Sequence, residues 1–365
     1  TVICMKKIEF SLFQKFKNKK VIITGHTGFK GSWLSLWMSM LGAEVSGISI
    51  SIPTNPSHFE LLNLKIKNDI RVDIYNSKKI EDIISRIKPD YVFHLAAQPL
   101  VALSYQNPLE TFQTNVVGTA NLLEALRELK NECIAVIITS DKSYDNLEIS
   151  RGYHEDDKLG GSDPYSGSKG AAELVINSYT KSFFIENNIR IGVGRAGNVI
   201  GGGDWAKNRI IPDAIRSIEN EQNLIIRSPN ATRPWQHVLE PLSGYISLAI
   251  NLKNSNENNG QAFNFGPSFE YDYTVQDVLV ELKKTITKLN WVVEKTKTFK
   301  ESTLLKLDCN KAHNLLNWSS TLNFQKTISF TSLWYLEYLN KNKNLKALSE
   351  NQILEFNRFV KNKKK

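Results

Sequence analysis

The fold is decided by residues 20–41, which read KVIITGHTGFKGSWLSLWMSML. The β-branched run Lys20–Thr24 predicts a buried strand, and Ser32–Leu41 predicts an apolar helix that Gly42 ends. The turn between them, Gly25–Gly31, has the spacing GxxGxxG. Glycines at these positions let the backbone turn tightly and approach a pyrophosphate, which the N–H groups at a helix N-terminus then bind. The stretch therefore predicts a dinucleotide-binding unit.

Strands and helices continue to alternate after this unit. Further strands are predicted at Glu44–Ile50, Asp69–Val72, Tyr91–His94, Ile134–Thr139 and Ile189–Arg195, and helices at Ile80–Ile87, Pro108–Leu129 and Pro164–Asn187. This alternation predicts an α/β fold, a Rossmann-type doubly wound parallel sheet with right-handed crossovers. Ligands of such sheets bind at the carboxyl ends of the strands, and all the motifs described below lie there.

The pattern divides the chain into two parts. We predict that residues 1–195 form the NAD-binding Rossmann domain. Residues 236–266, with a helix at Glu240–Leu252 and a strand at Ala262–Phe265, are predicted to return to its sheet. Residues 196–235 and 267–365 are predicted to form a smaller C-terminal substrate-binding lobe, whose last stretch, Lys341–Lys365, is a basic tail.

The cofactor is predicted from the end of the second strand. An acidic residue usually stands there to hold the adenosine ribose, but this chain offers only Ser49 and Ser51. No Arg or Lys takes the place of the acid, so we predict NAD. Because Lys30 could hold a 2′-phosphate, NADP stays open. Asp73, after the third strand, is a candidate to bind the adenine amino group.

Two polar motifs supply candidate catalytic groups. Tyr165 and Lys169 lie one helical turn apart on a shared face, where the lysine is expected to lower the pKa of the phenol. Tyr165 could then take a proton from a hydroxyl as hydride leaves the adjacent carbon. Ser140 can hydrogen-bond that hydroxyl, and the next residues, Asp141 and Lys142, add an acid and a base. A surface Tyr–Lys pair and a polar loop are the alternatives without function.

Composition narrows the functional class. The net charge is +9, but the lysines are spread along the chain, which favours solvated faces over a nucleic-acid site. No apolar run is long enough to cross a bilayer, and the first residues show no signal-peptide core. Three distant cysteines, Cys4, Cys133 and Cys309, argue against a disulfide framework or a metal cluster. We predict a cytoplasmic protein with no nucleic-acid, membrane or metal partner.

The motifs together resemble the extended short-chain dehydrogenase/reductase superfamily and, within it, the CDP-glucose 4,6-dehydratases. The resemblance covers about residues 20–240. The phrases that carry it are GHTGFKGSWL (Gly25–Leu34), HLAAQPLV (His94–Val101), SDKSY (Ser140–Tyr144), LGGSDPYSGSK (Leu159–Lys169), RAGNVIGGGDW (Arg195–Trp205) and RPWQHV (Arg233–Val238).

The resemblance implies a reaction: CDP-glucose becomes CDP-4-keto-6-deoxyglucose by internal hydride transfer through bound NAD. Sugar carbon 4 is oxidised, water is eliminated across carbons 5 and 6, and carbon 6 is reduced. Tyr165 would remove the hydroxyl proton, Ser140 would orient that hydroxyl and Asp141 would be the acid. Related dTDP-glucose dehydratases carry Thr-Asp-Glu where this chain has Ser140–Lys142, so Lys142 is predicted to replace their glutamate base.

The resemblance also implies binding residues and a quaternary structure. Asn115 would support the catalytic lysine, and substrate contacts are expected from Gln98, Asn198, Arg209 and Arg233. Members of the superfamily often dimerise through the helices at Pro108–Leu129 and Pro164–Asn187, so a homodimer or homotetramer is expected. The predicted cofactor contacts are Gly25, Thr27, Gly28, Phe29, Lys30, Gly31, Asp73, Ile74, Leu95, Ala96, Ala97, Asn115, Tyr165 and Lys169.

Other functions remain open from the sequence. Another sugar-nucleotide dehydratase, or a 4-epimerase, would use the same architecture. An epimerase needs no elimination acid and base, so Asp141 and Lys142 argue against it. A non-catalytic NAD(P)-sensing protein would share the fold, but such proteins usually lose the Tyr–Lys pair that this chain keeps.

Overall fold

The central feature of the computed structural model, which describes residues 10–267, 272–294 and 305–363, is a seven-stranded sheet in the order β10-β6-β5-β4-β1-β2-β3. Every pairing in it is parallel. The strand order reverses beside β1, which makes the carboxyl ends of β1 and β4 the expected ligand site. This confirms the predicted Rossmann-type sheet. The strands are β1 (Lys20–Thr24), β2 (Glu44–Ser49), β3 (Asn68–Arg71), β4 (Tyr91–His94), β5 (Cys133–Ile138), β6 (Ile189–Ala196) and β10 (Ala262–Phe265).

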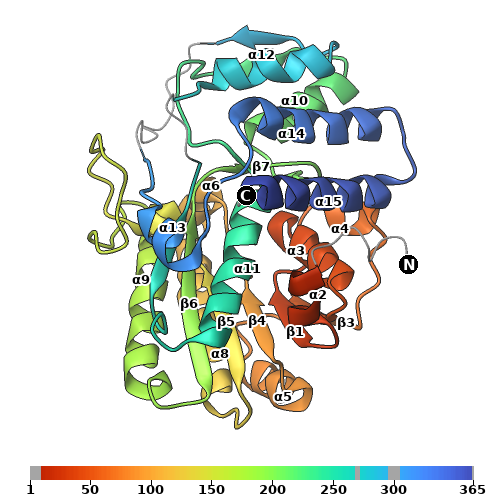
Figure 1. Ribbon diagram of the computed structural model, residues 1–365. Helices are drawn as coiled ribbons and strands as arrows, with labels where there is room; N and C mark the ends of the chain where they lie inside the picture. Colours follow the sequence, from red (N-terminus) through yellow and green to blue (C-terminus); the bar gives the residue numbers. More distant parts are fainter. Residues whose placement is uncertain (1–9, 268–271, 295–304, 364–365) are drawn as a thin grey trace.

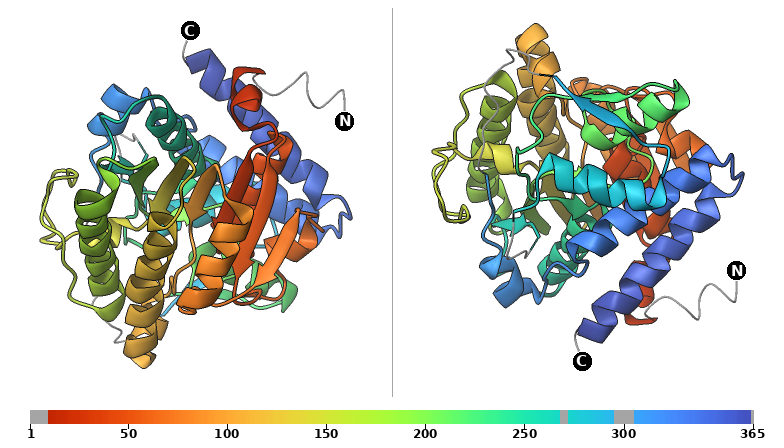
Figure 2. Two further views of the ribbon diagram at one scale, coloured as in Figure 1. Left: turned by 90° about the horizontal axis from the view of Figure 1, so that it is seen from below. Right: turned by 90° about the horizontal axis from the view of Figure 1, so that it is seen from above.

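Helices cover both faces of the sheet (Figures 1 and 2). Because side chains alternate along a strand, β1 sends Val21 and Ile23 into one apolar core and Ile22 into the other. The first core is closed by α3 (Phe29–Met40) and α11 (Leu239–Asn254), and the second by α5 (Ser77–Ile87), α8 (Gly118–Arg127) and α9 (Pro164–Tyr179).

The long helix predicted at residues 108–129 is interrupted. It consists of α7 (Pro108–Phe112), the π-helical turn η1 (Gln113–Val117) and α8, and it follows an unpredicted helix, α6 (Val101–Gln106). The helix predicted at residues 164–187 ends similarly, because α9 passes into the π-helical turn η3 (Thr180–Phe184). A π turn adds a residue to the helical repeat, and such turns are frequent at functional sites. The apolar periodicity of the sequence does not show it.

A second lobe stands above the sheet (Figure 1). Its helices are α10 (Ile210–Glu219), α12 (Val275–Thr285) and α14 (Phe324–Leu339), with the parallel pair β8 (Leu224–Ile226) and β11 (Trp291–Val293). A second short parallel pair, β7 (Val199–Ile200) and β9 (Gln236–His237), links it to the main sheet. Smaller helices are α2 (Phe10–Phe16), α4 (His58–Leu61), η2 (Asp141–Ser143) and α13 (Asn310–Leu316).

The stretch predicted as a basic tail is a packed helix. Helix α15 (Leu345–Lys363) lies against α14 and α3, and the ring of Phe356 meets Trp37 edge-on at 5.9 Å between centroids. Ile353 is fully buried on the same face. The prediction of a tail is wrong here because it followed the charge at the ends of the stretch and overlooked the apolar residues at helical spacing between them. Lys364 and Lys365 lie outside the described residues.

The described part of the chain sets some limits on partners. None of its helices combines the length and the apolar character that a membrane span requires. It contains no group of three or more His, Cys, Asp or Glu side chains that could hold a metal ion. Cys133 and Cys309 are free thiols, while Cys4 lies outside the described residues.

Glu240, at the start of α11, is a buried carboxyl with one unpaired oxygen. Its Oε1 accepts hydrogen bonds from the backbone N–H groups of Thr321 at 2.8 Å and Leu322 at 2.6 Å, while Oε2 has no partner. Burial raises the pKa of Glu240 from 4.5 to about 7, against the opposing charge of Lys363. The ionised form is therefore disfavoured in the folded protein.

The substitution Glu240→Gln should remove a pH-dependent loss of stability. The pKa of Glu240 is higher in the folded than in the unfolded chain. Below about pH 4.5 the carboxyl is protonated in both states and does not lower the free energy of unfolding. As the pH rises from there through about 7, the carboxyl lowers that free energy progressively. Glutamine keeps the acceptor oxygen without the charge. Urea unfolding should show the variant more stable at pH 8, by up to about 3 kcal/mol, with near-equal stability at pH 4. A variant less stable than wild type at pH 8 would contradict this.

Candidate active site

The glycine turn is built for close approach of a ligand to the backbone. Gly25 has a φ of 72°, in the left-handed region that favours glycine. A Cβ on Gly31 would lie 2.1 Å from the carbonyl oxygen of Gly25, and one on Gly25 would lie 2.8 Å from the backbone nitrogen of Ala96. Gly28 is the N-cap of α3 and has no side chain to accept the first-turn N–H groups, which therefore remain for an anion. These features fit a dinucleotide pyrophosphate.

A polar cluster takes the place of the missing acidic residue at the end of β2. The imidazole of His26 lies 2.9 Å from Ser49 Oγ through Nδ1 and 2.9 Å from Asp69 Oδ1 through Nε2. Asp69 also accepts a hydrogen bond from Arg71 Nη2 at 2.8 Å. In register, Arg71 is the β3 partner of Ser49. An arginine thus stands beside the expected ribose position, but it is paired with a carboxylate.

The other predicted adenosine and nicotinamide contacts lie at the neighbouring strand ends. Ala96 N–H donates to Thr24 Oγ1 at 3.1 Å, which holds Leu95–Ala97 against the glycine turn. The exposed Asp73 accepts from Tyr75 N–H at 2.9 Å. Ile74 is buried against Gly118, where a Cβ would lie 2.6 Å from its Cδ1.

Asn115 lies in the π turn η1 and joins three segments. Its Nδ2 donates to Ser168 Oγ at 2.8 Å, and its Oδ1 accepts from the backbone N–H of Gln98 at 2.8 Å. It therefore ties η1 to the helix that carries Tyr165 and Lys169.

Gln98, a predicted substrate contact, has its side-chain amide bonded within its own loop. Its Nε2 donates to Leu100 O at 3.1 Å and to Thr111 Oγ1 at 2.9 Å, and its Oε1 accepts from Leu100 N–H at 2.6 Å. Because both ends of the amide are used within this loop, Gln98 shapes the start of α6.

The loop that carries the predicted catalytic residues, called the catalytic loop below (residues 140–143), follows β5. Ser140 is the N-cap of η2, where its Oγ accepts from Lys142 N–H at 3.2 Å and donates to Asp141 Oδ1 at 2.8 Å. Asp141 is buried, and this burial raises the pKa of its carboxyl against the charges of Lys142 and Lys30. A carboxyl with a raised pKa keeps its proton to higher pH, as a general acid requires.

Helix α9 brings the Tyr–Lys pair to this loop. Asp163 caps it by accepting from Ser166 N–H at 3.0 Å, which places Tyr165 in the first turn. Burial raises the pKa of Tyr165 to about 12, opposed by a hydrogen bond with Ser140 and by the charge of Arg209. Burial thus outweighs the groups that lower this pKa, and the net shift is upward rather than the lowering expected from Lys169.

Two lysines, Lys30 and Lys169, repel each other electrostatically in this site. Burial and repulsion by Lys30 lower the pKa of Lys169 to about 8. Burial likewise lowers the pKa of Lys30 to about 8, with repulsion by Arg209 and attraction by Asp141. Lys30 therefore lies close enough to Arg209 and Asp141 to feel their charges. Its role as a 2′-phosphate ligand, which would keep NADP open, stays a prediction.

The predicted substrate residues border the catalytic loop. A Cβ on Gly197 would lie 3.0 Å from Asp141 Oδ2 and 3.3 Å from Pro234 Cγ, so the backbone next to Asn198 passes close to the acid and to the segment of Arg233. Asn198 O accepts from Gln236 N–H at 3.3 Å, and Arg233 Nη1 donates to Thr232 O at 2.8 Å. Arg209 begins α10 and pairs with the buried Asp204 at 2.9 Å, a partner that the sequence analysis missed.

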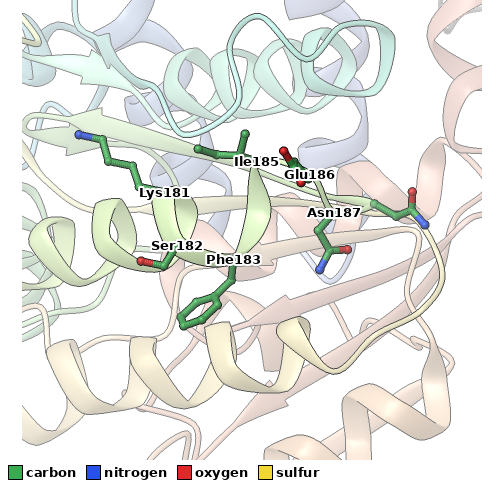
Figure 3. A pocket seen from close by; sticks show the side chains of 7 residues that line it. Lys181, Ser182, Phe183, Ile185, Glu186 and Asn187 are labelled. Carbon is green, nitrogen blue, oxygen red and sulfur yellow. The ribbon is translucent and has the colours of Figure 1, made fainter.

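A separate surface pocket lies elsewhere. It is formed where η3 leads into β6, and its lining residues are Lys181, Ser182, Phe183, Ile185, Glu186, Asn187 and Asn188 (Figure 3). These residues precede β6, so the pocket lies at the amino edge of the sheet, opposite the catalytic loop.

Comparison with known proteins agrees with this geometry. Residues 22–331 match the sequence profile of the family described as GDP-mannose 4,6 dehydratase. The CDP-glucose 4,6-dehydratase of Salmonella typhimurium strain LT2 is 46% identical over 89% of this chain and 92% of its own length. The chain belongs to the GDP-mannose 4,6 dehydratase family.

Membership of this family places the chain among the sugar-nucleotide dehydratases of the extended short-chain dehydrogenase/reductase fold. The epimerase alternative is less favoured, because the UDP-glucose 4-epimerase of Mycoplasma pneumoniae is only 25% identical over 88% of this chain and 98% of its own length.

Solved structures share the fold of this dehydratase family. An epimerase from Methanothermobacter thermautotrophicus superposes with a TM-score of 0.77 at 23% identity, over 91% of this chain and 96% of that one. The UDP-glucuronic acid 4-epimerase of Bacillus cereus, in complex with UDP-glucuronic acid and NAD, gives 0.72 at 23% identity, over 87% and 99%.

Proposed function

We propose that this protein converts CDP-glucose to CDP-4-keto-6-deoxyglucose with a bound NAD. The observation that carries the proposal is the meeting of Ser140 and Asp141 with Tyr165 at the carboxyl ends of the strands. The 46% identity to an enzyme named for that reaction supports the choice of substrate. When bound, the nicotinamide supplies reversible hydride transfer at the sugar.

The residues of the chain supply the proton transfers. Tyr165, in its ionised phenolate form, accepts the proton of the carbon-4 hydroxyl, which Ser140 orients. Asp141, whose pKa burial raises, donates a proton to the hydroxyl that leaves carbon 6. Lys142, as the neutral amine, removes the proton from carbon 5 and returns one there when carbon 6 is reduced. Arg209 and Arg233, with Asn198, bind the diphosphate, since guanidinium groups suit phosphate oxygens.

The test uses four nucleotide sugars. The protein and NAD⁺ are incubated with CDP-glucose, dTDP-glucose, UDP-glucose or GDP-mannose, and the products are weighed by mass spectrometry. Loss of one water from CDP-glucose alone, without net formation of reduced cofactor, is the expected result. No loss of water from any of the four would sink the dehydratase proposal.

The pairing of Arg71 with Asp69 bears on the choice between NAD and NADP. The Asp69 carboxylate neutralises the guanidinium at 2.8 Å, so the site favours a ribose without a phosphate. We therefore expect Asp69→Asn to raise the affinity for NADP⁺ relative to NAD⁺ about fivefold, in line with about 1 kcal/mol for an exposed ion pair. Isothermal titration with each cofactor measures the ratio.

The matched control is Glu44→Gln. It breaks the ion pair with Lys67 at the opposite end of β2 and should leave the ratio of affinities unchanged. An unchanged ratio in Asp69→Asn would show that Arg71 does not reach the 2′ position.

The assembly we propose is a homodimer formed through α7, η1 and α9, or a homotetramer built from such dimers. Large apolar side chains on these elements are exposed, among them Leu109 at 70% and Leu174 at 61%. Where such side chains form a contiguous patch, they mark an interaction surface. Light scattering after size-exclusion chromatography would separate monomer, dimer and tetramer.

The free thiols Cys133 and Cys309 support a reducing, cytoplasmic location.

A further inference from the structure

A buried ion pair lies directly behind the catalytic loop. Arg195, in β6, donates from Nε to Glu173 Oε1 at 2.8 Å and from Nη2 to Oε2 at 2.5 Å. Both side chains are only 4% exposed. Neither residue has a role in the proton transfers described above.

Both ends of the catalytic loop are attached to this pair. Thr139 precedes the loop, and its Oγ1 donates to Glu173 Oε1 at 2.7 Å. Tyr144 follows it, and its hydroxyl accepts from Arg195 Nη1 at 2.7 Å and donates to Asn264 Oδ1 at 2.8 Å. The guanidinium also lies 4.6 Å from the centre of the Tyr144 ring. The segment between these two anchors carries Ser140, Asp141 and Lys142.

The same pair is attached to the helix of the Tyr–Lys motif. Tyr165, Lys169 and Glu173 follow one another at intervals of one helical turn, so they share a face of α9. Holding Glu173 therefore fixes the rotation of α9 about its axis. The charge of Glu173 also raises the pKa of Lys169 against the effect of burial.

Stability alone does not account for such a pair. Removing two charges from water costs about as much as their attraction returns, so a buried ion pair adds little net stability. The pair here fixes the relative position of β6 and α9, since a bidentate guanidinium–carboxylate contact sets both the distance and the orientation between Arg195 and Glu173.

We propose that the Arg195–Glu173 pair is a positioning device that holds the Ser140–Lys142 loop in register with Tyr165 and Lys169. It acts on the reaction through Thr139 and Tyr144 and does not touch the substrate. The inference rests on the proposed function for its kinetic consequences. Its structural consequence, a loop held by two side-chain contacts, does not depend on the identity of the substrate.

The test removes the two attachments and leaves the ion pair in place. In the double variant Thr139→Val, Tyr144→Phe, we expect kcat with CDP-glucose to fall at least about tenfold, while KM stays within about threefold, because misplaced groups slow chemistry more than binding. Amide hydrogen exchange of residues 139–144, followed without substrate, should accelerate at least about tenfold. Thr331→Val is the matched control, since it removes a buried threonine hydroxyl bond within α14.

The outcomes separate the two proposals. An inactive wild-type protein would reject the proposed substrate, and the hydrogen-exchange comparison would still decide the positioning role. An unchanged kcat together with unchanged exchange in the double variant would overturn it. If the double variant fails to fold, Tyr144→Phe alone keeps the ring and tests the same two readouts, with the same unchanged values as the overturning result.

Discussion

Tyr165→Phe is expected to lower kcat for loss of water from CDP-glucose by about a thousandfold, within the range typical of a lost general base. The phenol is 8% exposed and lies in the first turn of α9, so phenylalanine fills the same space and the fold should be retained. The substitution removes the oxygen that bonds with Ser140 and would accept the hydroxyl proton. KM should change little, because the proton transfer belongs to the transition state.

The measurement is steady-state kinetics of both proteins, with circular dichroism to verify folding. Tyr179→Phe is the matched control: it lies on the same helix, where its hydroxyl bonds to Glu124, and should leave kcat within about twofold. A Tyr165→Phe variant that keeps more than about a tenth of the wild-type kcat would assign the proton transfer to another group.

The sheet could be predicted from the sequence because its information is local. Buried strands such as those at residues 20–24 and 133–138 are short β-branched runs, and the first is followed at once by a glycine turn. The π turn at Asn115 could not be predicted, because the extra residue is held by contacts with Gln98 and Ser168 from elsewhere in the chain. Helix α15 was missed because the basic residues at the ends of the stretch were weighed above the apolar spacing of Ile353 and Phe356 between them.

The candidate site is likewise predictable only in part, because some of its features follow from sequence spacing and others arise only in the fold. Tyr165 and Lys169 follow from spacing, and Ser140 and Asp141 from their place after a strand. The electrostatic influence of Asp141 and Arg209 on Lys30 arises from their positions in the fold, which no spacing along the chain contains. The same holds for the partnership of Glu173 with Arg195.

Lys142→Ala is expected to abolish exchange of the sugar carbon-5 hydrogen with solvent and to lower kcat by about a hundredfold to ten-thousandfold, the range for a lost general base. Lys142 is half-buried next to the acid, and its charge lowers the pKa of Asp141 against burial. Without that charge the pKa of Asp141 should rise further, so the acid stays protonated and only the base is missing. Oxidation at carbon 4 should continue, because Tyr165 is untouched.

Incubation with CDP-glucose in D₂O, followed by mass spectrometry, measures the exchange, and the near-ultraviolet absorbance of reduced nicotinamide measures the oxidation. The expected pair of results is no deuterium at carbon 5 and accumulation of reduced cofactor. Lys158→Ala serves as the control, since it removes an exposed lysine paired with Asp145 outside the catalytic loop and should leave both readouts unchanged. Intact exchange in Lys142→Ala would assign the base to another side chain. A partial return of exchange in Lys142→Glu would show that the position needs a proton acceptor rather than a positive charge.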